Sequence, residues 1–208
     1  AIQITGELCM PSLLKYRAAL EMAALMKMIK QQEKVNHYLA IAGRLKREIP
    51  SVFADQRGML SASTAKSQQA DVWSTSLAVY FDILTGEQLD KAARCITGAY
   101  KTGILAHRGN IRHIFTTDDY SAATAWESSL AAKNQYQNGA YWGTPTGWVC
   151  YTIAMVDTGA ARQLAKEYIE DLRSEDFRKG PDYGGPWECY NAESKQNPLY
   201  LTTVSCPF

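Results

Sequence analysis

Acidic side chains beside aromatic residues are the strongest candidates for chemistry in this sequence. Glu188 stands in GGPWECYN, where Gly184 and Gly185 let the backbone approach a ligand and Trp187 and Tyr190 supply apolar walls. Apolar surroundings raise the pKa of a carboxyl group, which suits a proton donor. We therefore predict Glu188 as a catalytic acid. The alternative is a loop carboxylate that is bonded to backbone amides.

Two further acidic residues are candidates for catalysis. Glu127 follows Trp126 in TAWESSL, where the sequence predicts a short helix, so a solvated acidic face is the alternative to a catalytic role. Asp71 precedes an apolar helical segment and is most simply its N-cap. The helix dipole favours an ionised carboxylate there, which suits a base or an acceptor of hydroxyl groups. Glycoside hydrolysis needs two carboxyl groups, one protonated and one ionised, so the predicted catalytic set is Glu188, Glu127 and Asp71.

The stretch YQNGAYWGTPTGWVCYTIAMVD, residues 136–157, places aromatic and turn residues directly before an apolar helix. Aromatic rings pack against the C–H faces of sugar rings, while amide and guanidinium groups bind the hydroxyls. Arg112 and His113 in GNIRHIF suit hydroxyls or a uronic carboxylate, with a structural role as the alternative. Asn138 and Gly139 form a tight turn first and a ligand contact second. The predicted substrate-binding residues are Trp142, Trp148, Trp187, Tyr141, Tyr190, Asn138, Arg112 and His113.

Hydrophobic periodicity predicts pairs of helices, each with a buried and an amphipathic member. Thr85 is a predicted N-cap, and Pro50 is expected to end the second helix. The connections between pairs are long and structureless by pattern, and only residues 2–4 and 111–115 suit short extended pieces. The sequence therefore predicts an all-α fold of about three and a half helical hairpins, with long loops and aromatic residues on one face. The predicted helices are 12–31, 34–49, 71–84, 85–101, 146–157 and 158–177, with a half pair at 197–208.

The composition narrows the class of protein. The chain has 208 residues, of which 46% are hydrophobic and 21% charged, and a formal net charge of +1. These values fit one globular domain over residues 1–208 and give no support to a nucleic-acid or anionic-membrane partner. No apolar run reaches the length of a membrane span, and residues 1–10 lack the regions of a signal peptide. A soluble protein is therefore expected, and its location stays unknown.

The sequence contains no cysteine pattern and no cofactor motif that would indicate a prosthetic group. The five cysteines are widely spaced, with no C-x-x-C pair and no Cys/His group at zinc spacing, so buried free thiols are predicted. The sequence contains no P-loop, dinucleotide fingerprint or Ser/His/Asp motif. We expect no metal and no cofactor, and the expected ligand is an oligosaccharide or a glycoside.

Four segments together resemble a known family: QQADVWSTSLAVYFDILTGEQ, GNIRHI, YQNGAYWGTPTGW and GGPWECYN. They are similar to the later hairpins of the six-hairpin glycosidases, whose helices form an (α/α)6 toroid, near the α-L-rhamnosidase branch. The resemblance implies a glycoside hydrolase, and the matching Trp-Glu pair implies a catalytic or sugar-binding role for Glu188. A repeat of about 62 residues leaves about three and a half hairpins here, whereas six would need about 370 residues.

That shortfall has two implications under the resemblance. The chain would be the C-terminal part of a larger catalytic domain, and a missing N-terminal half or a second chain would complete the ring. In the family, at least one catalytic carboxylate commonly lies in the earlier hairpins.

Two other functions compete with a glycoside hydrolase. A noncatalytic carbohydrate-binding protein would keep the aromatic pocket but lack a second carboxylate at about 5–9.5 Å from Glu188. A helical-repeat scaffold that binds protein would bury its aromatic residues under the long loops. The aromatic side chains would then hold those loops against the helices.

Overall fold

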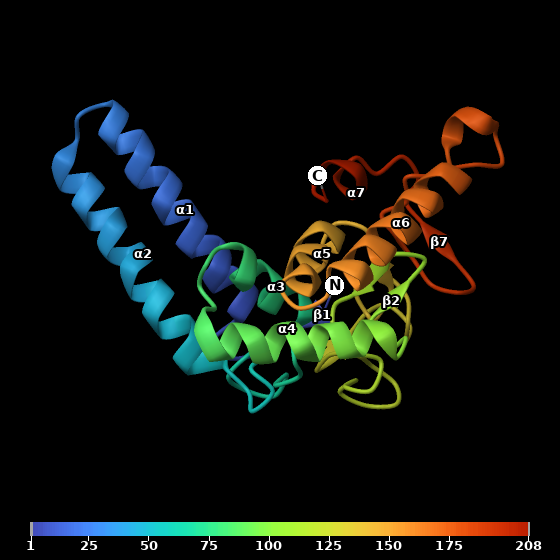
Figure 1. Ribbon diagram of the computed structural model, residues 1–208, viewed down its shortest axis with the longest axis horizontal. Coiled ribbons are helices and arrows are strands. Elements are labelled where there is room, and N and C mark those ends of the chain that lie inside the picture. The colour runs from blue at the N-terminus through green and yellow to red at the C-terminus, as the bar shows by residue number, and fades with distance from the viewer. Residues whose placement is uncertain (1, 208) are drawn as a thin grey trace.

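Three helical hairpins form the helical part of the structure, a computed structural model that describes residues 2–207 (Figure 1). The three predicted pairs of helices are present, whereas the predicted half pair is reduced to one short helix. The elements are α1 (Cys9–Met28) with α2 (Gln32–Phe53), α3 (Val72–Tyr80) with α4 (Gly86–Lys101), α5 (Thr146–Ala154) with α6 (Thr158–Ser174), a 3-10 turn η1 (Phe177–Lys179), and α7 (Thr202–Ser205).

The helices divide into inner and outer members as their sequences require. The inner helices α1, α3 and α5 pack against one another in series, and α5 also packs against α4 and α6. Helix α3 carries apolar or small hydroxyl residues on every side and is buried along most of its length. The outer helix α4 instead buries Ala92, Ala93 and Ile96 at helical spacing and turns its charged residues to solvent.

One predicted helix end is wrong, whereas two predicted N-cap positions are confirmed. Pro50 does not end α2, which continues to Phe53, because a proline in the last turn removes only one helical hydrogen bond and the burial of Ile49 and Phe53 holds that turn in place. Thr85 occupies the N-cap position of α4 as predicted, although its side chain forms no capping hydrogen bond. Asp71 caps α3 as predicted, since its side chain accepts a 2.9 Å hydrogen bond from the Ser74 amide.

The prediction of an all-α fold is wrong, because the long connections between hairpins pair with one another as β-strands. Residues 102–145 and 175–201 together build a five-stranded antiparallel sheet in the order β2-β3-β5-β6-β7. Backbone N–H and C=O groups that pack against the helices need hydrogen-bond partners. These two segments provide those partners for each other by pairing as strands. The strands are β2 (Ala106–His107), β3 (Asn110–Arg112), β5 (Tyr141–Trp142), β6 (Cys189–Tyr190) and β7 (Lys195–Gln196), and a second sheet pairs β1 (Ile2–Gln3) with β4 (Ser128–Ser129).

The register of the five-stranded sheet separates its side chains into two sets. Trp142 pairs with Ile111 on one side and with Cys189 on the other. Tyr141, one residue earlier, pairs with Arg112 and Tyr190. Because successive side chains of a strand point to opposite faces, the Trp142 row lies on one face of the sheet and the Tyr141 row on the other.

A small second core fastens the long connection after β3 to the N-terminal strand. The buried residues of this core are Ala62, Ile114, Ala125 and Trp126, and Ile2 and Ile4 pack against it. The indole N–H of Trp126 donates a 2.8 Å hydrogen bond to the carbonyl of Gln137. Trp126 therefore pins its loop, as the alternative interpretation of the tryptophans expected.

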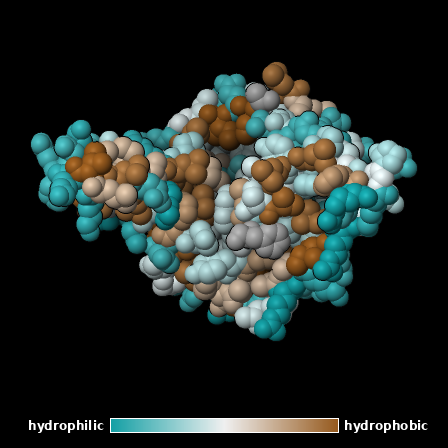
Figure 2. Space-filling model, turned by 90° about the horizontal axis from the view of Figure 1, so that it is seen from above, coloured by the Kyte–Doolittle hydropathy of each residue, from teal (hydrophilic) through white to brown (hydrophobic). Residues whose placement is uncertain are grey.

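One side of the helical array is open. The α1–α2 hairpin projects from the rest of the molecule (Figure 1), and hydrophobic residues gather around a central hollow in the view from above (Figure 2). Large apolar side chains that remain exposed on the three inner helices and just after α5 include Leu14, Leu25, Tyr80, Tyr151 and Met155. Within residues 2–207, no helix has the length and apolar character needed to cross a bilayer.

The five cysteines are free thiols, as predicted, but only two of them are buried. Cys9 and Cys189 lie inside the protein, Cys95 and Cys150 are partly buried, and Cys206 is exposed. Over the described part of the chain, no group of three or more His, Cys, Asp or Glu side chains is arranged to hold a metal ion.

Replacing Gly139 by alanine tests whether the turn before β5 is packed against the Arg112 guanidinium. A Cβ at residue 139 would lie 2.3 Å from Arg112 Nη2, and the φ of +102° adds backbone strain. We expect the free energy of unfolding in urea to fall by about 3 kcal/mol. Gly103→Ala is the control, because Gly103 has a φ of +74° but nothing within 4 Å of an added Cβ. Equal losses in the two variants would contradict the packing of Gly139 on Arg112.

Candidate functional site

Five aromatic side chains from distant parts of the chain form a continuous row. His113 stacks on Trp73 with ring centroids 4.3 Å apart, and Trp126 meets the edge of His113 at 4.9 Å. Trp142 stands edge-on to Trp73 at 5.8 Å, and Tyr136 lies 5.3 Å from Trp142. Trp126 is fully buried, whereas the other four rings are partly exposed. We call these five side chains the aromatic row.

Three structural elements position the row. Trp73 lies in the first turn of α3, two residues after the N-cap Asp71, and Trp142 lies in β5. His113 follows β3, and its carbonyl accepts the Val72 amide at 2.9 Å, which ties the sheet to the start of α3. The pairing of β3 with β5 then brings Trp142 to Trp73.

Glu188 lies at one end of the row. The hydroxyl of Tyr136 donates a 3.4 Å hydrogen bond to Glu188 Oε1, and the side-chain amide of Asn197 donates a short bond to Oε2. The carboxylate is buried. Burial, and next the Glu188 charge, raise the pKa of the Tyr136 hydroxyl, so Tyr136 remains a donor at neutral pH. Both carboxyl oxygens of Glu188 therefore accept a hydrogen bond from a neighbouring side chain.

Asp71 lies at the other end of the row. Its side chain is buried, caps α3 through the Ser74 amide and also accepts a short hydrogen bond from the Ser74 hydroxyl. Nε2 of His113 lies 3.0 Å from Asp71 Oδ1. The Asp71 carboxylate and the His113 ring are therefore in direct contact beneath Trp73.

Glu127 lies outside the row, and the short helix predicted around it is wrong because the next two residues form β4. Glu127 Oε2 accepts hydrogen bonds from the Thr5 amide at 3.0 Å and the Thr5 hydroxyl at 2.8 Å, and Lys66 Nζ lies 3.6 Å from Oε1. The Thr5 hydroxyl is the largest cause that lowers the pKa of Glu127. An ionised carboxylate with these partners fastens the N-terminal strand.

Three predicted substrate-binding residues lie on the opposite face of the sheet from Trp142. Arg112 is buried and donates to the carbonyls of Gly139, Ile114 and Phe115 and to Asp119. Tyr190 donates a short hydrogen bond to Asp171, which also accepts from Asn110. Tyr141 lies 5.5 Å from the ring of His107. The structure therefore does not bring Arg112, Tyr141 and Tyr190 together with Trp142.

The three remaining predicted residues also have partners outside the row. Asn138 accepts from the Ala125 amide and donates to the carbonyl of Ala131, so it fastens its own loop. The Trp187 indole donates to Glu175 at 3.3 Å, with Lys195 Nζ 5.6 Å from its ring centroid. Trp148 packs against the main core from α5.

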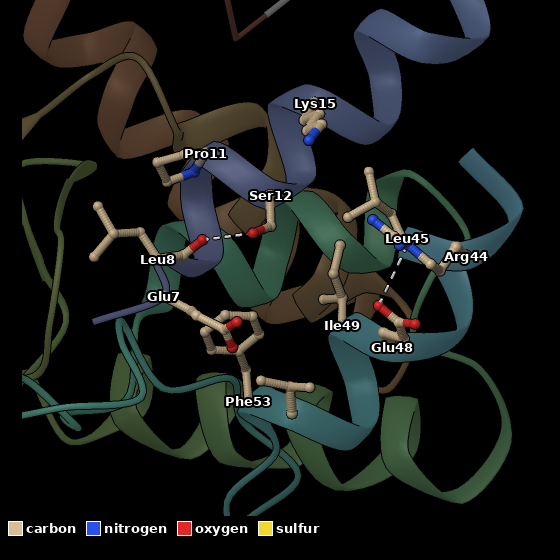
Figure 3. A pocket seen from close by; sticks show the side chains of 11 residues that line it. Glu7, Leu8, Pro11, Ser12, Lys15, Arg44, Leu45, Glu48, Ile49 and Phe53 are labelled. Carbon is tan, nitrogen blue, oxygen red and sulfur yellow. Dashed lines mark hydrogen bonds and ion pairs between the residues drawn. The ribbon is translucent and has the colours of Figure 1, made fainter. Parts of the chain in front are cut away.

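Several cavities lie elsewhere on the surface. A groove of about 420 Å³ between the start of α1 and the second half of α2 is shown in Figure 3. Leu45 and Ile49 line it, and Arg44 Nε lies 3.8 Å from Glu48 Oε2 at its edge. This groove contains none of the predicted site residues.

Sequence reasoning left three residues out of the predicted site. Trp73 carries a usable signal, because it follows the N-cap of an inner helix and the long loops meet at that end. Tyr136 had a similar signal as an aromatic residue of the 136–157 stretch. Asn197 had none, because its contact with Glu188 depends on the turn between β6 and β7.

Comparisons with known proteins do not assign this site. A scan against protein-family models finds no match, and a search of curated proteins finds none. The chemistry of the site must therefore be argued from its own residues.

Replacing Glu127 by glutamine tests the role of its carboxylate as a fastening. The pKa of Glu127 is lower in the folded protein than in the unfolded chain, so its charge stabilises the fold above the ordinary glutamate pKa of about 4.3. This stabilisation is lost as the pH falls through the lower, folded-state pKa. We expect Glu127→Gln to lower the urea midpoint at pH 7 and to differ progressively less from the wild type as the pH falls.

The matched control is Glu170→Gln. The Glu170 side chain is exposed, and its ion pair with Lys166 Nζ, at 3.8 Å, is a surface pair that contributes little to stability. A pH-independent difference for Glu127→Gln, or the same pH profile for both variants, would contradict the role of Glu127.

Proposed function

We propose that the protein binds a carbohydrate along the aromatic row and that it is a glycoside hydrolase-like protein in which Glu188 contacts the sugar. The observation that carries the proposal is the contact between two partly exposed indoles, Trp73 and Trp142, next to a tyrosine bonded to a buried carboxylate. Rings of this kind pack on the C–H faces of sugars, and the carboxylate accepts hydroxyl hydrogens.

The surroundings of Glu188 support a particular role within this proposal. Tyr136 and Asn197 both donate to its carboxyl oxygens. A carboxylate that accepts two hydrogen bonds suits an acceptor of sugar hydroxyls or a base more than the proton donor expected from the sequence. The resemblance to six-hairpin glycosidases, near the α-L-rhamnosidase branch, supports the same substrate class.

The second candidate function is a noncatalytic carbohydrate-binding protein. One observation favours it: the other two predicted catalytic carboxylates already have structural partners. Asp71 is held by Ser74 and His113, and Glu127 is held by Thr5 and Lys66. Hydrolysis would then need a second carboxylate from outside this set, and the proposed additional half or second chain is its expected source.

Replacing Trp142 by alanine tests carbohydrate binding by the row. We expect the affinity for a bound oligosaccharide to fall by about tenfold or more, since the indole that joins Trp73 to Tyr136 is lost. Isothermal titration calorimetry with a panel of neutral and uronic oligosaccharides provides the measurement. Trp187→Ala is the control, because Trp187 contacts Glu175 and Lys195 instead of the row. Binding that is unaffected by Trp142→Ala but lost with Trp187→Ala would refute the proposed location.

Replacing Glu188 by glutamine separates the two candidate functions. If the protein hydrolyses aryl-glycosides, we expect the variant to lose about 10²–10⁴-fold in kcat, because a positioned acid or base is removed. A noncatalytic binding protein predicts no turnover by the wild type and a weaker saccharide affinity in the variant. Unchanged kcat in an active protein would remove Glu188 from the reaction.

A further inference from the structure

A small cavity lies at the Asp71 end of the aromatic row. Its volume is about 280 Å³, close to the lower end of ligand cavities at about 300 Å³, so it suits one small ring. We call it the His113 cavity. Six apolar side chains and two polar ones line it: Ile2, Ile4, Leu8, Met10, Pro11, Ala62, Asp71 and His113. A cavity of this composition suits a group with an apolar body and a single hydrogen-bonding atom.

The two polar residues are held in fixed positions. Asp71 is fixed by its bonds to the amide and hydroxyl of Ser74. The His113 ring is fixed between the parallel face of Trp73 and the edge of Trp126. A binding group held in this way loses little conformational entropy when a ligand arrives.

The contact with Asp71 determines which nitrogen of His113 is available. Nε2 lies 3.0 Å from Asp71 Oδ1 and is buried, although its N–H bond is not aligned on that oxygen as in a hydrogen bond. The negative charge of Asp71 nonetheless attracts the ring proton to Nε2. No group within residues 2–207 forms a hydrogen bond with Nδ1, which is left as an acceptor.

A competing role for the neighbouring thiol is ruled out by its surroundings. Cys9 is fully buried, and burial, followed by the charge of Asp71, raises the pKa of its thiol far above neutrality. A thiol of this kind stays protonated and is not a nucleophile. The available chemistry of the cavity therefore belongs to His113.

We propose that the His113 cavity binds a hydroxyl-bearing ring, with Nδ1 of His113 accepting the hydroxyl hydrogen and Asp71 acting as a positioning residue. The apolar side chains pack against the C–H groups of the same ring. Because His113 belongs to both the cavity and the aromatic row, the ring is the end unit of a saccharide that lies along the row. Only this last identification, a saccharide as the ligand, rests on the proposed function.

The test uses NMR spectroscopy, because the chain has only three histidines, His37, His107 and His113. The probes are cyclohexanol and three methyl glycosides, of D-glucose, D-mannose and L-rhamnose. We expect the His113 ring signals to shift with cyclohexanol and with at least one glycoside, while the His37 and His107 signals stay in place. Ala62→Val narrows the cavity and leaves Asp71 and His113 unchanged. It should weaken the binding of cyclohexanol and of the glycoside by about tenfold.

Asp71→Asn tests the positioning role, because asparagine can still cap α3. In the wild type, the ¹⁵N shifts of His113 should report a proton on Nε2 and none on Nδ1. In the variant they should report a mixture of the two tautomers, together with about tenfold weaker cyclohexanol binding. His37→Gln, on the outer helix α2, is the control and should change neither readout. If Asp71→Asn does not fold, the wild-type tautomer and Ala62→Val still decide the proposal.

Two results would overturn the proposal. One is a wild-type His113 with its proton on Nδ1, and the other is a His113 signal that no probe moves. If cyclohexanol shifts His113 but no glycoside shifts either His113 or the Trp142 indole, the cavity stands and the carbohydrate function fails. If glycosides shift Trp142 and no probe, cyclohexanol included, shifts His113, the carbohydrate function stands and the cavity proposal fails.

Discussion

Backbone pairing between two long connections is the constraint on which the rest of this structure depends. Residues 102–145 and 175–201 carry most of the residues of the site, and each is too irregular to hold a side chain in place alone. The pairs β3–β5 and β5–β6 fix them to each other. The bond from the Val72 amide to the His113 carbonyl then fixes the sheet to the first turn of α3. The start of α3 and the end of the interior strand β3 thus form one rigid unit.

The same pairing separates two kinds of chemistry. The face that carries Trp142 meets Trp73 and leads to Glu188, so it combines partly exposed rings with a carboxylate. The opposite face holds Arg112 and Tyr190, whose polar atoms are taken up by carbonyl groups and by Asp171. Residues one position apart in the sequence therefore differ in role, with Tyr141 on the polar face and Trp142 in the aromatic row.

The sequence predicts helices better than it predicts the site, for physical reasons that particular residues illustrate. The periodicity of α4 and the cap at Asp71 are local signals, and both are present in the structure. Strands of two or three residues have no readable period, so the sequence does not indicate the sheet and predicts an all-α fold instead. The aromatic neighbours of Glu188 indicate it as a site residue, but its bond to Asn197 depends on the pairing of β6 with β7, which strands of two residues do not reveal. The sequence indicates Arg112 by its charge, but an ion pair with Asp119 and three backbone carbonyl groups already satisfy that charge.

Hydrogen exchange at single backbone amides tests the central claim, that the two connections and the start of α3 form one unit. The amides of residues 110–112, 141–142 and 189–190 should exchange slowly and at a common rate, close to that of the α3 amides. Fast exchange at these positions, at the rate of an exposed loop, while α3 stays protected, would show that no fixed sheet holds Trp142 against Trp73.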